Sequence, residues 1–451
     1  MDSATHLKRI LTLGVPLVGS HLAQFSIQLT DTVMLGWYDV EVLAGQVLGQ
    51  TLFFLIFIVG SGFAWAVMPL IAEAEAAGDH TQLRRAMRMA LWLTGGFAVL
   101  CLPAFLGARQ IFDAIGQEAA LSELAGRYLW IQGWSIFPAL GVMVLKSTLA
   151  ALERTQVVFW VTLATVVVNA VCNYSLIFGH WGAPEMGVEG AAWASLASTL
   201  AGLVGLVVYI RATLPGEALF ARLWRVDAGA LLRVFRLGWP IGLTSLAEAG
   251  LFSASTVMMG WIGAVPLAAH GIALQIISVM FMIHIGLSNV ATIRAGAALG
   301  RRDGVELRRG GAIVLAVSGA VAIVTVALLL VAPQRLMGLF LDPADPARDA
   351  VLAIGVGLLA AAALFQFVDA AQVMALGLLR GVQDTRVPMV FAALSYWVVG
   401  VPLAWVFAFR MGFGGIGLWL GMAVGLGLAA VLMMTRFWKR GAYAVENGSG
   451  S

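Results

Sequence analysis

Twelve long apolar stretches follow one another along this chain and leave few folds open to it. They begin near Ile10, Leu43, Ala86, Tyr128, Val157, Gly190, Leu231, Val265, Gly311, Val351, Val387 and Gly415. Each has about 20 or more residues, and a helix of that length crosses the roughly 30 Å of hydrocarbon in a bilayer. The alternation of apolar and polar residues that marks barrel strands is absent. The sequence therefore predicts an all-α integral membrane protein with twelve transmembrane helices.

The composition agrees with a membrane protein, and two common enzyme motifs are missing from the chain. Charged residues make up 11% of the 451 residues and hydrophobic residues 61%, whereas about a quarter of a soluble protein is charged. The nucleophile motif G-x-S-x-G and the zinc motif H-E-x-x-H are both missing. Cys101 and Cys172 fall inside predicted spans, with no metal-type spacing around either. We therefore predict no enzymatic activity and no cofactor, in a chain surrounded by the lipid bilayer.

Basic residues are distributed unevenly between the two sides of the predicted membrane. With the N-terminus in the cytoplasm, twenty-one Lys and Arg residues fall on cytoplasmic segments and five on outer ones. Cytoplasmic loops of membrane proteins carry such an excess, so both termini are predicted to be cytoplasmic. This orientation accounts for the net charge of +3, and no nucleic-acid partner is needed to explain it.

The two halves of the chain repeat each other. Leu-Gly-Val-Pro at 13–16 recurs as Leu-Gly-Trp-Pro at 237–240, and Thr-Val-Met at 32–34 recurs at 256–258. Both pairs are 224 residues apart, and six predicted spans lie in that interval. An even number of spans means that the two copies run in the same direction through the membrane. The sequence thus predicts two six-helix lobes related by a parallel repeat, with a central cleft between them.

The repeat also sets the predicted domain boundaries. They are an N-terminal lobe at 1–211, a cytoplasmic linker at 212–236, a C-terminal lobe at 237–440 and a tail at 441–451 that resembles a cloning remnant. A two-lobe bundle with polar residues inside each lobe suits a carrier that works by alternating access, because rocking lobes open a cavity to one side at a time. We expect such a carrier to be a monomer.

Three carboxylates interrupt the apolar runs. Asp31, Glu248 and Asp369 each lie inside a predicted span, far from any loop. A charge at such a depth costs about 2.5 kcal/mol or more, so it normally lines a protein interior, a water cavity or an ion path. The alternative is that each is a structural acid held by its neighbours. We take the three acids as the first candidates for a functional site.

In the first lobe, the acid lies level with two amides. Asp31 and Asn173 are at similar distances from the outer ends of their spans, and Asn169 is one turn deeper. Carboxylate and amide oxygens bind small hard cations, so we predict a cation-coupling site, possible for Na⁺ at Asp31 and Asn173. The alternative is that the asparagines form hydrogen bonds between helices.

The second lobe combines two acids with aromatic and sulfur-containing side chains. Carboxylates removed from water suit reversible proton binding near neutral pH. Beside aromatic rings they also suit organic cations, and flexible Met side chains adapt to many ligands. The repeat aligns Gln24 with Glu248, and Asp31 with Ser255. The predicted substrate-binding residues are Glu248, Asp369, Gln24, Ser255, Phe252, Phe365 and Met258.

Four short motifs together resemble the multidrug and toxic compound extrusion (MATE) family, in its NorM-type bacterial branch. They are LTDTVMLG at 29–36, GAPEMG at 182–187, AAH at 268–270, and LRG at 379–381 followed by Asp384. The resemblance implies two six-helix lobes in a bacterial inner membrane. It also implies export of cationic drugs and dyes in exchange for Na⁺ or H⁺.

The resemblance places residues of this chain in roles as well. Asp31, Asn169 and Asn173 fall on the first-lobe cation site of the family, and Glu248 and Asp369 on its second-lobe acids. Some relatives carry an acid where Asn173 stands, so the choice between Na⁺ and H⁺ remains open. The alternatives to a multidrug antiporter are a lipid-linked precursor flippase of the same superfamily, for which a strongly basic cavity is expected, and a membrane receptor or scaffold that transports nothing.

Overall fold

The computed structural model describes residues 3–341, 343 and 346–441. Every regular element among these residues is a helix, and twelve helical segments are long and apolar enough to cross a membrane. Each of the twelve starts predicted from the sequence falls inside one of these segments. The prediction of an all-α protein with twelve transmembrane helices is therefore confirmed.

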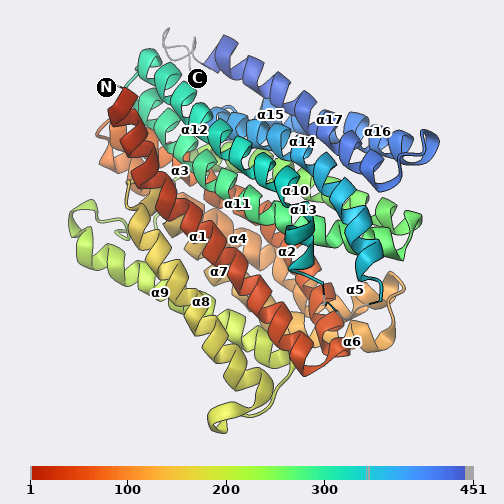
Figure 1. Ribbon diagram of the computed structural model, residues 1–451. Coiled ribbons are helices and arrows are strands. Elements are labelled where there is room, and N and C mark those ends of the chain that lie inside the picture. Colours follow the sequence, from red (N-terminus) through yellow and green to blue (C-terminus); the bar gives the residue numbers. More distant parts are fainter. Residues whose placement is uncertain (1–2, 342, 344–345, 442–451) are drawn as a thin grey trace. The chain divides into compact units, whose positions relative to one another are not determined.

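Figure 1 shows the helices in chain order. Up to the linker they are α1 (Ser3–Tyr38), α2 (Val40–Trp65), α3 (Val67–Ala76), α4 (His80–Leu106), α5 (Ala108–Ala114), α6 (Ala119–Gln132), η1 (Gly133–Ser135), α7 (Ile136–Ala151), α8 (Thr155–Phe178), η2 (His180–Gly182), α9 (Val188–Thr213) and η3 (Pro215–Glu217). Beyond it they are α10 (Ala228–Ile262), α11 (Ala264–Gly300), α12 (Gly304–Val331), α13 (Pro333–Gly338), α14 (Arg348–Gly381), α15 (Arg386–Ala393), η4 (Leu394–Gly400), α16 (Val401–Trp405), η5 (Val406–Arg410), α17 (Gly414–Arg436) and η6 (Phe437–Gly441). Several spans join two or more helices end to end, as α2 and α3 do.

The chain divides into two compact units. The first unit consists of residues 19–242, and the second unit of residues 1–18 together with 243–451. Helices α1 and α10 contribute to both, because the divisions fall inside them. The lobe boundaries predicted from the repeat, and the cleft between the lobes, stay predictions. Of the predicted tail, residues 442–451 lie outside the described residues.

Two helices at equivalent positions of the sequence repeat begin with the same kind of cap, an aspartate carboxylate. The Asp79 carboxylate accepts hydrogen bonds from the backbone N–H groups of Thr81 and Gln82, at 3.1 and 3.0 Å, and so caps α4. Asp303, 224 residues later, caps α12 by accepting the Glu306 N–H at 2.8 Å. A cap of this kind is worth about 1 kcal/mol because it satisfies N–H groups that the helix leaves free. The repeat thus fixes the starts of equivalent helices in both halves.

The linker between the halves forms hydrogen bonds with α4. His80 Nδ1 lies 2.9 Å from Glu217 Oε2, Arg88 Nη1 donates to the Arg222 carbonyl at 3.2 Å, and Trp92 Nε1 donates to the Leu223 carbonyl at 2.8 Å. The hydrogen bond from Ala230 N–H, aided by Arg85, holds the pKa of Asp227 below its usual value. Helix α10 begins at Ala228, so residues 228–236 of the predicted linker are helical.

Helix α14 occupies a central place in the second unit, where it packs along α11, α12 and α17 (Figure 1). Small residues allow close approach: a methyl group on Gly377 would lie 2.6 Å from the Ser288 carbonyl oxygen of α11. Ser288 and Thr292 then donate hydrogen bonds to backbone carbonyls of α14. Packing through small residues and interhelical hydrogen bonds is typical inside membranes, where lipid gives no hydrophobic force between helices. This packing fixes the helix that carries Asp369.

Candidate functional site

Asp31 lies in a buried polar cluster of the first unit. Asn173 Nδ2 on α8 donates a hydrogen bond to Asp31 Oδ1 at 2.5 Å, and Ser195 Oγ on α9 donates to Asp31 Oδ2 at 3.3 Å. Asn173 Nδ2 also reaches Asn169 Oδ1 at 3.1 Å. Both asparagines are fully buried, and Asp31 is 7% exposed. The structure thus brings the carboxylate and both predicted amides together. Asn173 forms the interhelical hydrogen bond that the sequence left as the alternative, whereas the hydrogen bond to Asn169 lies within α8.

Two buried polar atoms of this cluster lack hydrogen-bond partners among the described residues. They are Asn173 Oδ1 and Asn169 Nδ2. Asn173 turns its NH₂ group toward the carboxylate and its oxygen away. Which atom of an amide is oxygen follows from the hydrogen-bond network. Rotation of the amide by half a turn would present its oxygen to Asp31 instead, an arrangement that requires either a cation between the two oxygens or a proton on Asp31.

Gln24 is placed away from the buried core of the first unit. Its side chain is exposed, and its Oε1 accepts a hydrogen bond from Lys146 Nζ at 3.3 Å. Lys146 is half-buried, and this hydrogen bond joins it to an amide rather than to an acid. Gln24, which the repeat aligns with Glu248, is therefore exposed, whereas Glu248 is half-buried.

In the second unit, Asp369 is the most isolated of the three acids. It is fully buried on α14, and both of its carboxylate oxygens lack hydrogen-bond donors among the described residues. Glu248 on α10 is half-buried, and its Oε1 is likewise without a donor there. The two acids interact electrostatically with each other, and Arg380 acts on Glu248. Two carboxylates on different helices thus interact with each other, and three of their four oxygens have no hydrogen-bond donor among the described residues.

Amide side chains line the same face of α14 as Asp369. Gln366 and Gln372 lie three residues on either side of it, and both are fully buried. Gln366 has no hydrogen-bond partner on either amide atom, and Gln372 Oε1 also has none, within the described part of the chain. Buried polar atoms are normally satisfied by protein or by ordered water. This face of α14 therefore carries buried polar atoms that the described residues leave unsatisfied.

Two of the predicted aromatic residues share helix faces with these acids, since Phe252 is four residues beyond Glu248 and Phe365 is four residues before Asp369. The Phe365 ring meets Phe252 edge-on at 5.8 Å and Trp419 at 5.3 Å between ring centroids. Phe365, Ser255 and Met258 are buried, and Phe252 is half-buried. Ser255 Oγ donates to the Phe252 carbonyl of its own helix. Of the predicted substrate-binding side chains, Phe252 and Phe365 therefore pack against each other.

Comparison with known proteins identifies the family. Residues 16–175 and 240–406 match the MatE family model, which covers more than half of the chain. The chain belongs to the MatE family. The resemblance seen in the sequence motifs is confirmed.

The relatives of this MatE chain match it along nearly its whole length. A protein from Rhizobium meliloti (strain 1021) named "Probable multidrug resistance protein NorM" is 44% identical over 96% of this chain and 94% of its own. A protein of the same name from Agrobacterium fabrum (strain C58 / ATCC 33970) is 42% identical over the same shares. The crystal structure of a MATE protein in complex with MaL6 superposes with a TM-score of 0.89 at 19% identity, over 98% of this chain and 97% of that one. The last match shows the same fold.

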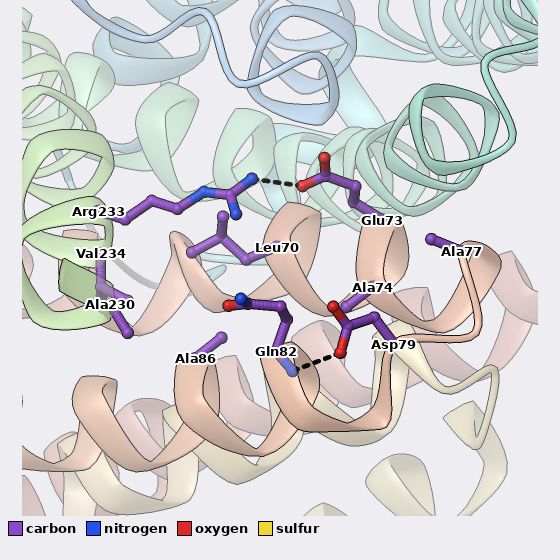
Figure 2. A pocket seen from close by; sticks show the side chains of 10 residues that line it. All are labelled: Leu70, Glu73, Ala74, Ala77, Asp79, Gln82, Ala86, Ala230, Arg233 and Val234. Atoms are coloured by element: carbon purple, nitrogen blue, oxygen red, sulfur yellow. Dashed lines mark hydrogen bonds and ion pairs between the residues drawn. The ribbon is translucent and has the colours of Figure 1, made fainter. Parts of the chain in front are cut away.

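A cavity of about 180 Å³ lies elsewhere in the first unit, between α3, α4 and α10. Figure 2 shows Arg233 reaching across it to Glu73, with 2.6 Å between Nη2 and Oε2. Its lining residues are Leu70, Glu73, Ala74, Ala77, Asp79, Gln82, Ala86, Ala230, Arg233 and Val234. None of the predicted site residues lines it. We regard it as a gap between helix ends, because its charged groups are paired or serve as caps.

Sequence reasoning missed four polar residues of the two clusters, namely Ser195, Gln366, Gln372 and Tyr396. A signal existed for the two glutamines, since both lie three residues from Asp369 in an apolar run. Ser195 gave none, because hydroxyls in membrane helices usually bond their own backbone. Among the described residues, no group of three or more His, Cys, Asp or Glu side chains could hold a metal ion. A cation at Asp31 would therefore depend on the amide oxygens.

Proposed function

We propose that this MatE chain is a multidrug efflux transporter that exports organic cations in exchange for Na⁺ or H⁺ by alternating access. The observation that carries the proposal is Asp369, a fully buried carboxylate whose oxygens have no hydrogen-bond donor within the described residues. An uncompensated buried charge is costly and gives nothing to stability. Its retention is explained if a proton, a metal cation or an organic cation binds there during each transport cycle.

The acids of the second unit favour a cationic cargo. Phe252 is four residues beyond Glu248 and Phe365 is four residues before Asp369, so each ring shares a helix face with an acid. A desolvated carboxylate beside aromatic faces attracts organic cations. The names of the two relatives, both multidrug resistance proteins, support the same substrate class. A lipid-linked precursor carries phosphate and would call for a basic surface, which these acids do not supply.

The first unit offers a second place for the coupling ion. Asp31, with the amide oxygens of Asn169 and Asn173, supplies the hard oxygen ligands that Na⁺ prefers. In the present conformation the Asn173 NH₂ group stands where such an ion would lie. Entry of Na⁺ would replace that hydrogen bond with ion coordination. Entry of H⁺ would instead neutralise Asp31 and leave the amide in place.

Transport by purified protein in vesicles tests the proposal directly. We expect a fluorescent organic cation to move against its gradient when a Na⁺ or pH gradient is imposed, and not without one. If one net charge entered per drug, a membrane potential of 100 mV would sustain about fiftyfold accumulation. Empty vesicles and vesicles without an ion gradient are the controls. A protein that binds the dye but moves none under either gradient would contradict the proposal.

Competition between ion and drug gives a further prediction. A carboxylate cannot pair fully with an inorganic and an organic cation at once, so each should weaken binding of the other. We expect dye affinity to fall about tenfold for each tenfold rise of the coupling ion above its own dissociation constant. Dye binding to purified protein, measured across Na⁺ concentration and pH, identifies the ion. Indifference to both would exclude competition even if the protein transports.

The orientation of the chain is a separate prediction, based on the excess of basic residues on one side. In a variant with Cys101→Ala and Cys172→Ala, we expect Gln117→Cys or Pro184→Cys to react with an impermeant thiol reagent from outside cells. Val305→Cys should react only after the membrane is opened. All three positions are exposed, so access to solvent does not limit labelling. The reverse pattern would place both termini outside and reverse the direction of transport.

A further inference from the structure

We propose that His270 is a positioning residue for the substrate site, where its hydrogen bonds orient three aromatic rings and so set the preference for flat organic cations. The three rings, called the aromatic block here, are Trp419, Phe365 and Phe252. This inference rests on the proposed function, because it names a specificity-determining residue for the same cargo. All the groups involved belong to the second unit.

His270 of α11 forms hydrogen bonds with two neighbouring helices. Trp419 Nε1 of α17 donates to His270 Nδ1 at 3.2 Å. On the other side of the ring, His270 Nε2 lies 3.3 Å from Thr256 Oγ1 of α10. His270 and Trp419 are both fully buried, so water does not compete for the bond between them. The imidazole thus joins α10 and α17 through side chains alone.

The donors and acceptors around His270 assign its proton. An indole N–H can only donate, so Nδ1 is the unprotonated nitrogen. The Thr256 hydroxyl donates its own hydrogen to the Phe252 carbonyl oxygen at 3.0 Å and can therefore accept from Nε2–H. His270 is thus a neutral imidazole with its hydrogen on Nε2, and each of its nitrogens has one partner. Both bonds fix the plane of the imidazole ring and, with it, the direction of the indole.

The indole that His270 orients is the first of the three rings in the aromatic block. Trp419 meets Phe365 of α14 with 5.3 Å between ring centroids and an angle of 87° between ring planes. Phe365 in turn meets Phe252 of α10 at 5.8 Å and 71°. Edge-to-face pairs depend on the tilt of each ring relative to the next. A change in the direction of the indole should therefore alter the tilt of Phe365 and then of Phe252.

Phe252 is the ring of the block that is available to a cation. It is half-buried, whereas Phe365 and Trp419 are fully buried. It is also four residues beyond Glu248, on the same face of α10. A flat organic cation held by that carboxylate would stack on the Phe252 ring, and the strength of this contact depends on the tilt of the ring. His270 would then influence specificity without touching the cargo.

The test compares two cations of equal charge that bind the purified full chain. Ethidium is flat and aromatic, whereas tetrabutylammonium has no ring. The preference is the dissociation constant of tetrabutylammonium divided by that of ethidium, and a change that only loosens the fold weakens both and leaves the ratio unchanged. In His270→Leu the indole loses its acceptor, so we expect the preference to fall about fivefold, as for one lost aromatic contact.

His270→Gln is the conservative variant that separates hydrogen bonding from ring packing. Its amide offers one acceptor and donors on the same planar group, and so can bond both the indole and the Thr256 hydroxyl. It should restore most of the preference that His270→Leu loses. If His270→Leu fails to fold, Trp419→Phe decides instead, because it keeps an aromatic ring and removes the N–H that His270 binds. It should lower the preference in the same direction.

The matched control is His284→Leu. His284 is also fully buried on α11, and its Nδ1 lies 3.0 Å from Ser318 Oγ of α12. It makes the same chemical change on the same helix, but neither His284 nor Ser318 belongs to the aromatic block. Thermal unfolding of all variants is measured alongside binding. His284→Leu should lower the unfolding temperature and keep the parental preference.

The outcomes distinguish this inference from the proposed function. A preference that falls in His270→Leu, returns in His270→Gln and is unchanged in His284→Leu supports the positioning role. In a parent that transports ethidium, a folded His270→Leu variant with the parental preference overturns that role alone, and so does an equal loss in His284→Leu. A parent that neither transports ethidium nor binds it overturns the proposed function, and this inference with it.

Discussion

Replacing Asp369 by Asn, or Glu248 by Gln, should nearly abolish drug efflux while leaving the fold as stable as in the parent. Each change removes the charge and almost keeps the shape. Losing a desolvated charge opposite a cation costs about 2–5 kcal/mol, so we expect transport to fall about thirtyfold or more. Vesicle transport of a fluorescent cation, together with thermal unfolding of the same purified variants, measures both effects.

The combination of lost function and kept stability is the diagnostic part of this prediction. A structural acid would be held by hydrogen-bond donors, and its amide replacement would destabilise the fold. Asp369 has no such donors among the described residues, so Asp369→Asn removes an uncompensated charge and should leave the melting temperature unchanged or raise it.

The control for this prediction lies on the same helix. Asp349→Asn makes the same chemical change at the first turn of α14, where the Asp349 side chain is 96% exposed. It should transport as the parent does. Parental transport by both Asp369→Asn and Glu248→Gln, at normal expression, would mean that the acids of the second unit are structural.

Much of the fold could be predicted because the membrane imposes a simple rule. Apolar stretches long enough to span must be helices, since no water is present to satisfy free backbone groups. The twelve spans follow from that rule, and all predicted starts fall within observed helices. The caps at Asp79 and Asp303 show that the repeat extends to local hydrogen bonding.

Only part of the candidate site could be predicted from the sequence. Charged residues in apolar runs are conspicuous, so Asp31, Glu248 and Asp369 stood out directly. Partners contributed by other helices were not visible, because helix rotation and tilt are set by packing that hydropathy does not record. Ser195 reaches Asp31 from α9, and Tyr396 reaches Gln372 from η4, across 164 and 24 residues of sequence. The π-helical form of η4 likewise left no recognisable pattern.

The two acid clusters differ in a way that leads to the second main prediction. Asp31 accepts hydrogen bonds from Asn173 and Ser195, whereas Asp369 accepts none within the described residues. Asn173→Asp would remove the shorter of those hydrogen bonds and place a second carboxylate 2.5 Å from the first. Two carboxylates at such a distance cannot both stay ionised unless a proton or a cation lies between them.

We therefore expect Asn173→Asp to be destabilised by about 3 kcal/mol in Na⁺-free buffer near pH 8, and to recover when Na⁺ is added or the pH is lowered to 5. The sign follows because protons or cations bind the folded pair more tightly than the unfolded chain, so stability is gained as either is added. Thermal unfolding in Na⁺, in choline and across pH measures it.

Asn173→Leu separates the added charge from the lost hydrogen bond. It also deprives Asp31 of its Asn173 donor but adds no second acid, so its loss of stability should not be reversed by Na⁺. If Asn173→Asp responds to neither Na⁺ nor pH, then the oxygens around Asp31 do not form a cation site. Coupling would in that case depend on Glu248 and Asp369 alone.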